Sequence, residues 1–367
     1  MPSCDLALCY GTRPQIIKAS VLRKEFGADL SLLAVDTGQH YDYALNALLY
    51  EQLGVRSPDL FLEVGSGSHA DQTGNIMTRL EPLLREYKPR AAVVIGDTNS
   101  TLGCALAAAK LRIPVVHVEA GLRSHDRLMA EEINRRATDA LASLLCTPCG
   151  AATRRMWAEH PDAKVVETGD VSHDVLLGQL DRLPEPASVI PGGLNGEYIY
   201  ATLHRAELTD QREVLIDVLR VLGTLDARVV LAVHPRTRAV LDSVSADAYG
   251  SSNVSIIPAV GYLESLALTR SAAAVVTDSG GLQREAYWMG TPCVTVRGET
   301  EWTETLDCGA NRLVPPATAK HTLAQVVVEQ RLRWRSDLRW DNTAYGSGRA
   351  AAVVAEAVRA LLAEHLA

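Results

Sequence analysis

The sequence predicts an α/β fold with two doubly wound parallel sheets, each in its own domain, and a ligand cleft between them. Three observations predict it. Short runs of Val, Ile, Leu and Ala alternate with helical patterns through most of the 367 residues. Within these runs apolar and polar residues do not alternate, as expected for strands covered by helices on both faces. A Pro- and Gly-rich break around residues 180–196 separates two similar halves.

Each half supplies the strands and helices of one sheet. Apolar runs in the first half predict strands at 5–10, 30–38, 91–97, 114–119, 143–149 and 163–169. Helical patterns predict helices from Pro14 and at 44–53, 100–111 and 151–160. In the second half the predicted strands are 198–204, 227–235, 254–260, 272–280 and 292–298, and an Ala-rich helix closes the chain at 348–367. We therefore expect an N-terminal domain at 1–178 and a C-terminal domain at 190–347.

The composition limits the kind of partner. The chain is 47% hydrophobic with a net charge of −8, which argues against general binding to nucleic acid or to a membrane surface. No apolar run reaches the roughly 18 residues of a transmembrane helix, and the N-terminus lacks the basic start of a signal peptide. Cys146 and Cys149 have redox or zinc spacing, but without a second such pair they are expected to be small buried residues. A cytoplasmic enzyme is expected.

Polar and ionisable residues follow nearly every predicted strand. In parallel sheets, ligands bind beyond the carboxyl ends of the strands, so these positions form the candidate site. They are residues 11–14, 36–40, Asp97, Glu119, His204, Arg205, 234–236, 278–281, Arg297, Glu299 and Glu301. A polar residue after a single strand is often only the cap of the following helix, whereas polar residues after eight strands together predict a polar ligand.

A phosphate site is predicted in "VVTDSGGLQREA". Residues 279–281 (Ser-Gly-Gly) open a helix after a buried strand, so free N–H groups and the positive end of the helix dipole point outward. Glu285 lies six residues beyond Ser279, within reach of a ribose on the same ligand. The segment "GTRPQIIK" repeats this geometry in the first half, where Arg13 and Lys18 are expected to address a second anionic group.

The segment "MAEEINRRATDAL" predicts a charged helix. Its (i, i+4) pairs are Glu131–Arg135, Glu132–Arg136 and Arg135–Asp139. This spacing explains most of the charges as a salt-bridged helix face. Because the helix follows Glu119 closely in the chain, Glu131 is also a candidate for the same edge of the sheet.

Eight motifs, in order from about residue 6 to 315, together resemble the UDP-N-acetylglucosamine 2-epimerase family. They are "GTRPQIIK", "TGQHYDY", "GSGSHADQTG", "GDTNSTLGCALAAAKLRIPVVHVEAGLRS", "MAEEINRRATDAL", "TLHRAE", "VHPRTR" and "TDSGGLQREA". The resemblance implies a GT-B-like fold of two Rossmann-like domains, with the nucleotide held mainly by the second domain and the last helix returning to the first. It also implies a homodimer, and neither a dissociable redox cofactor nor a required metal.

The same resemblance implies roles for individual residues. The reactive acids would be Asp97, Glu119 and Glu131, and the substrate contacts Arg13, Lys18, His204, Ser279, Gly280, Gly281 and Glu285. Some bacterial members bind a second UDP-GlcNAc as an activator. Gln39, Arg205 and His234 match that site, and activation stays open for this chain.

The implied reaction inverts C2 of the sugar, interconverting UDP-GlcNAc and UDP-ManNAc by anti elimination of UDP to a 2-acetamidoglucal and re-addition. The C2 proton is weakly acidic, so one carboxylate must remove it while a second acid returns a proton to the opposite face. Repulsion between neighbouring carboxylates would raise the pKa of one of them and keep it protonated. Arg13, His204 and the helix start at Ser279 would stabilise the departing diphosphate.

Departures from the family pattern occur at Gln15, Ala130, Leu208, Ser265 and Trp302. Because of these departures, the sequence does not define the residues of the uridine pocket or the identity of the sugar. One alternative is a UDP-diacetamido-uronate 2-epimerase, in which Arg123, His125 or Arg127 would face the carboxylate, and another is a hydrolysing epimerase. Outside this class, a GT-B glycosyltransferase or a non-catalytic UDP-sugar sensor would leave the three acids without a purpose.

Overall fold

The computed structural model describes residues 4–39, 50, 54, 56–124, 126–193, 196–244, 253–335, 340 and 342–364. The chain divides into two compact units, one of Met1–Gly178 with Thr343–Ala367 and the other of Gln179–Asn342. We call them unit 1 and unit 2. The domain limits drawn from the sequence stay a prediction. The helix expected at 44–53 lies outside the described residues except at Tyr50.

Unit 1 is built on a parallel sheet with seven described strands. They are β1 (Leu6–Tyr10), β2 (Leu32–Asp36), β3 (Leu60–Phe61), β4 (Ala91–Ile95), β5 (Val115–Val118), β6 (Leu144–Thr147) and β7 (Lys164–Glu167). Their spatial order is β3-β2-β1-β4-β5-β6-β7. β1 and β4 are buried along their whole length, which confirms the prediction of strands covered on both faces. The strand order reverses between β1 and β4, the point at which such sheets bind ligands.

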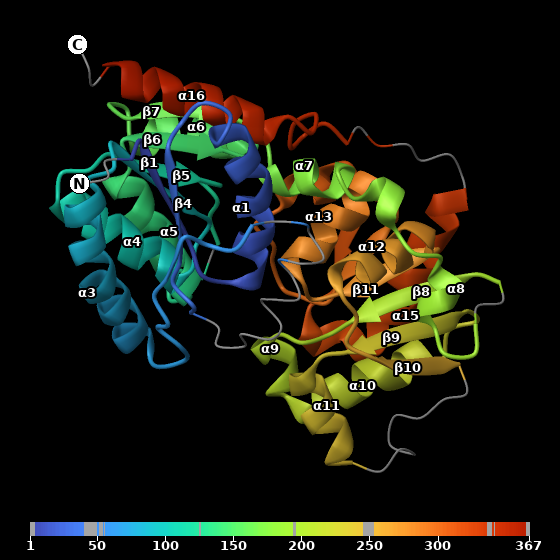
Figure 1. The fold of residues 1–367 in the computed structure, drawn as a ribbon. Coiled ribbons are helices and arrows are strands. Elements are labelled where there is room, and N and C mark those ends of the chain that lie inside the picture. The colour runs from blue at the N-terminus through green and yellow to red at the C-terminus, as the bar shows by residue number, and fades with distance from the viewer. Residues whose placement is uncertain are drawn as a thin grey trace. The chain divides into compact units, whose positions relative to one another are not determined.

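Helices cover both faces of this sheet (Figure 1). One face packs against α1 (Arg13–Phe26) and the C-terminal α16 (Ala350–Glu364), and the other against α3 (His69–Tyr87) and α4 (Asn99–Lys110). The further helices of unit 1 are α5 (Ala130–Leu141), α6 (Gly150–Glu159) and α7 (Val171–Leu177). Helix α16, red in Figure 1, contacts α1, α7 and β6, so the two ends of the sequence build one core.

The start of α16 is attached to α7 through Asp174. The two carboxylate oxygens of Asp174 accept the N–H groups of Ala350 at 2.9 Å and Ala351 at 2.7 Å. A carboxylate at a helix N-terminus satisfies free donors and the helix dipole together. A Cβ added at Gly169 would lie 2.9 Å from the carbonyl oxygen of Tyr345, so this approach of two backbones requires glycine.

His173 of α7 makes this contact sensitive to acid. Burial lowers its pKa from the ordinary 6.5, although a backbone hydrogen bond involving Gly346 and the charges of Asp170 and Asp174 oppose the shift. Folded His173 therefore binds a proton less readily than unfolded His173, and protonation favours unfolding. We expect the unfolding free energy to fall as the pH drops below about 6.5, and to fall less in His173→Gln. Urea unfolding at a series of pH values measures this, and identical pH dependence in both proteins would contradict it.

Unit 2 repeats the architecture with six described strands. They are β8 (Tyr198–Thr202), β9 (Arg228–Val233), β10 (Val254–Pro258), β11 (Ala274–Thr277), β12 (Cys293–Thr295) and β13 (Asn311–Leu313), in the order β10-β9-β8-β11-β12-β13. The reversal falls between β8 and β11. The prediction of two Rossmann-like, doubly wound parallel sheets is therefore confirmed.

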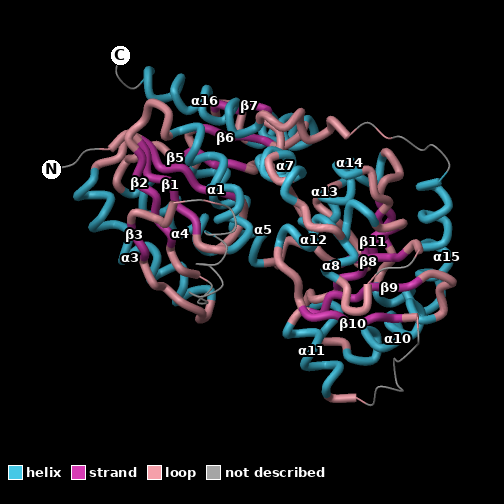
Figure 2. The backbone as a smooth tube through the Cα atoms, turned by 45° about the vertical axis from the view of Figure 1, so that its right-hand side comes forward, coloured by secondary structure: helices cyan, strands magenta, loops and turns pink. Residues whose placement is uncertain are grey.

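The helices of unit 2 also cover both faces of its sheet, as Figure 2 shows. α10 (Arg212–Gly223) and α15 (Pro316–Arg335) pack on one face, and α12 (Tyr262–Ser271) and α13 (Gly280–Met289) on the other. The shorter helices are α9 (Ala206–Thr209), α11 (Pro235–Asp242) and α14 (Thr303–Asp307). The segment expected to lack regular structure contains a 3-10 turn, η1 (Leu180–Arg182), and one short helix, α8 (Pro186–Val189).

Three further properties concern membranes, metals and cysteines. Over the part of the chain that the structure describes, no helix combines the length and apolar character needed to cross a bilayer. Those same residues include no group of three or more His, Cys, Asp or Glu side chains placed to hold a metal ion. Cys146 and Cys149 are buried free thiols, as predicted, and burial raises the pKa of Cys146 to about 12.

Candidate active site

Asp97 lies at the carboxyl end of β4, beside the switch point of unit 1. Gly96, with a φ of +66°, turns the chain there. Arg135 of α5 donates to one carboxylate oxygen of Asp97 from Nε at 2.9 Å and from Nη2 at 2.6 Å. The side chain of Arg135 is 7% exposed and that of Asp97 is 31% exposed. The buried guanidinium thus holds the Asp97 carboxylate at this strand end through two charge-assisted hydrogen bonds.

Glu119 lies at the end of the neighbouring strand β5. Its φ of +68° is in the left-handed region, which is rare for residues other than glycine and is often found at functional sites. Lys18 of α1 forms an ion pair with the Glu119 carboxylate, and the two side chains are 9% and 12% exposed. The structure therefore brings two predicted acids to adjacent strand ends and gives each its own cation.

The third predicted acid differs from its neighbour in the sequence. Glu132 is fully buried, whereas Glu131 in the first turn of α5 is exposed and forms no ion pair with a described residue. The donors to the Glu132 carboxylate are the Ser124 N–H at 2.8 Å, Arg136 at 2.8 Å and Arg135 at 3.3 Å. The predicted Glu132–Arg136 pair is confirmed. The predicted Glu131–Arg135 pair is wrong, because Arg135 points toward Asp97 and Glu132.

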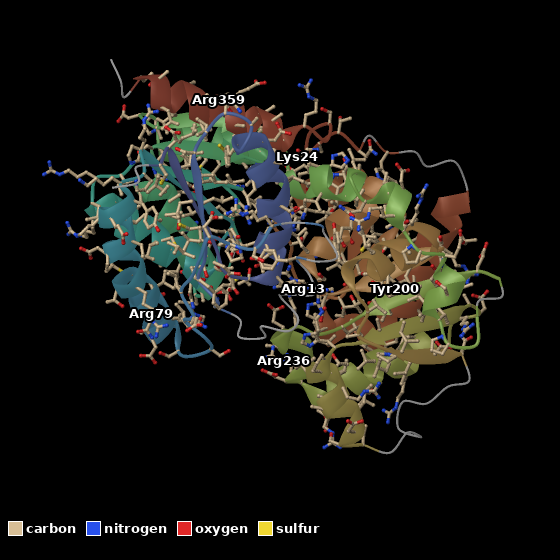
Figure 3. The ribbon with its side chains drawn as sticks, in the orientation of Figure 1. Arg13, Lys24, Arg79, Tyr200, Arg236 and Arg359 are labelled. Atoms are coloured by element: carbon tan, nitrogen blue, oxygen red, sulfur yellow. The ribbon has the colours of Figure 1, made fainter. Side chains whose placement is uncertain are left out.

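The loop after β1 carries one exposed cation and one buried amide. Arg13, the first residue of α1, is exposed and makes no hydrogen bond or ion pair with any described residue (Figure 3). The Gln15 side chain is buried, and its Oε1 accepts the N–H groups of Gly11 at 2.9 Å and Thr12 at 3.1 Å. Its Nε2 donates to the Ile95 carbonyl at 2.6 Å. A glutamate, the usual family residue, could not donate there, so Gln15 specifically joins the loops after β1 and β4.

Two other candidate residues of unit 1 are engaged in protein contacts. The side-chain oxygen of Gln39 accepts the N–H of Ser100 at 2.9 Å and its hydroxyl at 2.7 Å, so the activator role of Gln39 stays a prediction. Arg123 donates to Asp139 at 2.6 Å and to Glu159 at 2.5 Å. With its side chain only 7% exposed, Arg123 is therefore not a free cation for a sugar carboxylate. His40 and His125 lie outside the described residues.

In unit 2, Asp278 organises the loop after β8. One of its carboxylate oxygens accepts the N–H groups of His204 at 2.7 Å and Arg205 at 2.8 Å, and the other lies 3.0 Å from Nδ1 of His204. Asp278 is buried, and the His204 side chain is 35% exposed. The Asp278 carboxylate therefore lies against both the backbone and the ring of His204.

His234 lies beside this loop, at the end of β9. Its ring centroid is 5.5 Å from that of His204. Burial, together with the charges of His204 and Arg236, lowers the pKa of His234, while Asp278 opposes the shift. His234 and Arg205 therefore flank His204, and their predicted role in an activator site stays untested.

The start of α13 has free backbone donors. Ser279 caps the helix by accepting the Leu282 N–H at 3.4 Å, and the N–H groups of Gly280 and Gly281 have no partner among the described residues. A Cβ added at Gly280 would lie 3.3 Å from Nε1 of Trp302, so the indole flanks this helix start. The Arg284 guanidinium lies 3.8 Å from the centre of the Trp302 ring, a contact that the sequence did not predict.

Glu285, the predicted ribose contact, lies one turn further along α13 and is partly buried. Burial raises the pKa of Tyr200, and the charge of Glu285 raises it further. The Tyr200 hydroxyl lies 3.1 Å from the hydroxyl of Ser265. Some family members have an aromatic residue at the position of Ser265. Tyr200 is labelled on its strand in Figure 3.

Ser279→Pro tests the phosphate site. The substitution removes the cap and also the N–H that donates to Thr277 at 3.0 Å, so the free donors of α13 lose their fixed direction. We expect UDP affinity to fall by about tenfold or more, as for the loss of a hydrogen bond to a charged group. Ser279→Ala keeps the N–H and should lose less. Calorimetric titration with UDP measures both, and unchanged affinity in Ser279→Pro would place the phosphate elsewhere.

Comparison with known proteins identifies the family. The family model described as UDP-N-acetylglucosamine 2-epimerase matches residues 24–359. The chain belongs to the UDP-N-acetylglucosamine 2-epimerase family. It is 40% identical to the UDP-2,3-diacetamido-2,3-dideoxy-D-glucuronate 2-epimerase of Pseudomonas aeruginosa, covering 94% of this chain and 97% of that one. It is 36% identical to the UDP-N-acetylglucosamine 2-epimerase of Methanocaldococcus jannaschii, covering 90% of this chain and 94% of that one.

Solved structures of this epimerase family agree with the fold. The Methanocaldococcus jannaschii UDP-GlcNAc 2-epimerase in complex with UDP-GlcNAc and UDP has a TM-score of 0.85 and 35% identity, covering 97% of this chain and 99% of that one. The Neisseria meningitidis UDP-GlcNAc 2-epimerase bound to UDP-GlcNAc has a TM-score of 0.84 and 26% identity with the same coverage. A Phytolacca americana protein complexed with UDP-2fluoro-glucose shares only the fold, with a TM-score of 0.59 and 12% identity over 99% of this chain and all of that one.

Proposed function

We propose that this epimerase interconverts UDP-GlcNAc and UDP-ManNAc by anti elimination of UDP to a 2-acetamidoglucal and re-addition. The observation that carries the proposal is the pair of acids at neighbouring strand ends of unit 1. Asp97 and Glu119 follow β4 and β5, and each has a cation of its own. A reaction that removes a proton at C2 and returns one to the other face requires two such groups.

The surroundings of the reacting acids suggest a different role for each of them. Asp97 combines a buried guanidinium with the larger exposed fraction, which favours it as the base that removes the C2 proton. Glu119 accepts a hydrogen bond from Lys18, both side chains are largely buried, and we assign to this pair the return of a proton on the opposite face. Glu131 is exposed at the start of α5 and would contact the sugar or the leaving group.

Unit 2 would bind the nucleotide. The start of α13 presents the N–H groups of Gly280 and Gly281, and His204 is held by Asp278 beside the same switch point. Backbone donors of this kind stabilise the charge that a diphosphate gains as the C1–O bond breaks. Glu285 would accept from the ribose hydroxyls. The cleft expected between the domains, the homodimer and the cytoplasmic location stay predictions.

A proton NMR time course with UDP-GlcNAc in deuterated buffer tests the proposal. We expect the C2 proton signal to disappear as UDP-ManNAc forms, because elimination exchanges that proton with solvent. Accumulation of free ManNAc and UDP would instead show a hydrolysing epimerase. If the protein binds UDP but neither exchanges nor converts UDP-GlcNAc, its sugar is a different one.

A UDP-diacetamido-uronate is the second candidate substrate, favoured by the 40% identity to the Pseudomonas aeruginosa enzyme. A uronate requires a cation at C6. Arg123 forms ion pairs with Asp139 and Glu159, whereas Arg127 is exposed and is therefore the candidate for this cation. The same NMR experiment with the diacetamido-glucuronate sugar decides between the candidates, because the true substrate should exchange at C2 with the higher kcat/KM.

A further inference from the structure

His117 is buried directly beneath the loop that carries Asp97. It belongs to β5, two residues before Glu119, and its ring is fully buried. Nε2 lies 2.7 Å from the carbonyl oxygen of Gly96, and Nδ1 lies 2.7 Å from a carboxylate oxygen of Asp139. The imidazole thus bridges α5 and the residue that precedes Asp97.

Both partners of this ring are hydrogen-bond acceptors. The Gly96 carbonyl can only accept, so Nε2 must carry a proton for that contact to be a hydrogen bond. The second oxygen of Asp139 accepts from Arg123 at 2.6 Å. Burial opposes ionisation of Asp139, but His117 and Arg123 outweigh it and lower the pKa of Asp139. Arg123 and the His117 ring therefore lie at the two carboxylate oxygens of Asp139.

The backbone of Asp97 is held on both sides. Asn134 donates to the Asp97 carbonyl at 2.9 Å, while His117 faces the carbonyl of the preceding Gly96. Arg135 fixes the carboxylate itself. Asn134, Arg135 and Asp139 all belong to α5, so one helix positions Asp97 through three separate contacts. Of these three contacts, the one made through His117 reaches the carbonyl of the left-handed Gly96, where the chain turns out of β4, while the Gly96 N–H donates to the Val118 carbonyl at 2.9 Å.

We propose that His117 is a positioning residue for the epimerase reaction: held by Asp139, it donates to the Gly96 carbonyl and so fixes the turn that aims Asp97 at the sugar. The inference rests on the proposed role of Asp97 as a reacting acid. A turn that loses this donor would let the carboxylate shift, and a shift of about 1 Å can cost roughly 100-fold in rate. Nucleotide binding, which we assign to unit 2, should be little affected.

Two substitutions separate the two contacts of the ring. In His117→Asn the amide can replace Nδ1 toward Asp139 but is too short to reach Gly96. In His117→Gln the amide can replace Nε2 and donate to Gly96. We expect His117→Asn to lower kcat by about 10- to 100-fold with KM and UDP affinity within about threefold, and His117→Gln to recover most of the loss. Glu159→Gln, which changes only the outer partner of Arg123, is the control and should keep the wild-type kcat.

A measurement without turnover completes the test. Nitrogen-15 NMR of the histidine rings in the wild-type protein should show a proton on Nε2 of His117, assigned by loss of the signal in His117→Gln. A bare Nε2 would overturn the proposal, as would equal losses in both variants that follow their thermal stability. If the wild-type protein exchanges no UDP-sugar at C2, the proposed function fails instead, and the NMR result still decides whether His117 donates to Gly96.

Discussion

Asp97→Asn should lower turnover by about 100-fold or more, the usual range for loss of a positioned acid or base. The amide keeps the size of the side chain but cannot accept the C2 proton. Arg135 retains Glu132 as a charged partner at 3.3 Å, so the buried guanidinium is not left alone and the fold should persist. UDP affinity should stay within severalfold of wild type, because the proposed phosphate donors at the start of α13 belong to unit 2. Deuterium exchange at C2 and titration with UDP measure the two quantities.

Asp29→Asn is a matched control for this substitution. Asp29 also accepts hydrogen bonds from the Nε and Nη2 of one arginine, Arg359, at 2.7, 2.9 and 3.2 Å, but its side chain is 52% exposed and it lies after α1 rather than after a strand. Exposed pairs of this kind contribute little to stability. Turnover in Asp29→Asn should equal that of wild type. Normal turnover in Asp97→Asn would remove Asp97 from the mechanism, whatever the control shows.

Glu132→Gln should destabilise unit 1 by about 1–3 kcal/mol, because a fully buried carboxylate loses its charge-assisted hydrogen bonds from Arg135 and Arg136. Glu132 is fully buried and accepts from Ser124, Arg135 and Arg136. The neighbouring Glu131 is exposed, so Glu131→Gln should change the unfolding free energy by less than about 0.5 kcal/mol. Urea unfolding followed by circular dichroism compares the two variants.

The same pair of variants separates structure from chemistry. We expect Glu131→Gln to lower turnover by about 100-fold while its unfolding midpoint stays at the wild-type value. Glu132→Gln should lose activity only to the extent that it unfolds. If Glu131→Gln keeps full turnover, the third acid of the mechanism is not Glu131. If Glu132→Gln is as stable as wild type, its buried ion pairs contribute nothing measurable.

The sequence by itself determined the fold class and the edges at which the candidate residues lie. Buried strands such as β1 and β4 are continuous apolar runs, a pattern that follows from helices on both faces and requires no knowledge of distant contacts. Parallel strands place their carboxyl ends at one edge of a sheet, so Asp97 and Glu119 could be placed together before any coordinates. The short β3 was missed because two residues carry no periodicity.

Only the tertiary structure decided which charges meet. The (i, i+4) rule describes neighbours on an isolated helix, but packing of α5 on unit 1 turns Arg135 toward Asp97, 38 residues away in the sequence. Lys18 and Glu119 are separated by 101 residues, and His117 looked like part of an apolar strand. A charged side chain that is removed from water costs free energy unless it is paired with an opposite charge. The partner is whichever charge the fold brings close, and spacing in the sequence does not give the distance between residues far apart in the chain.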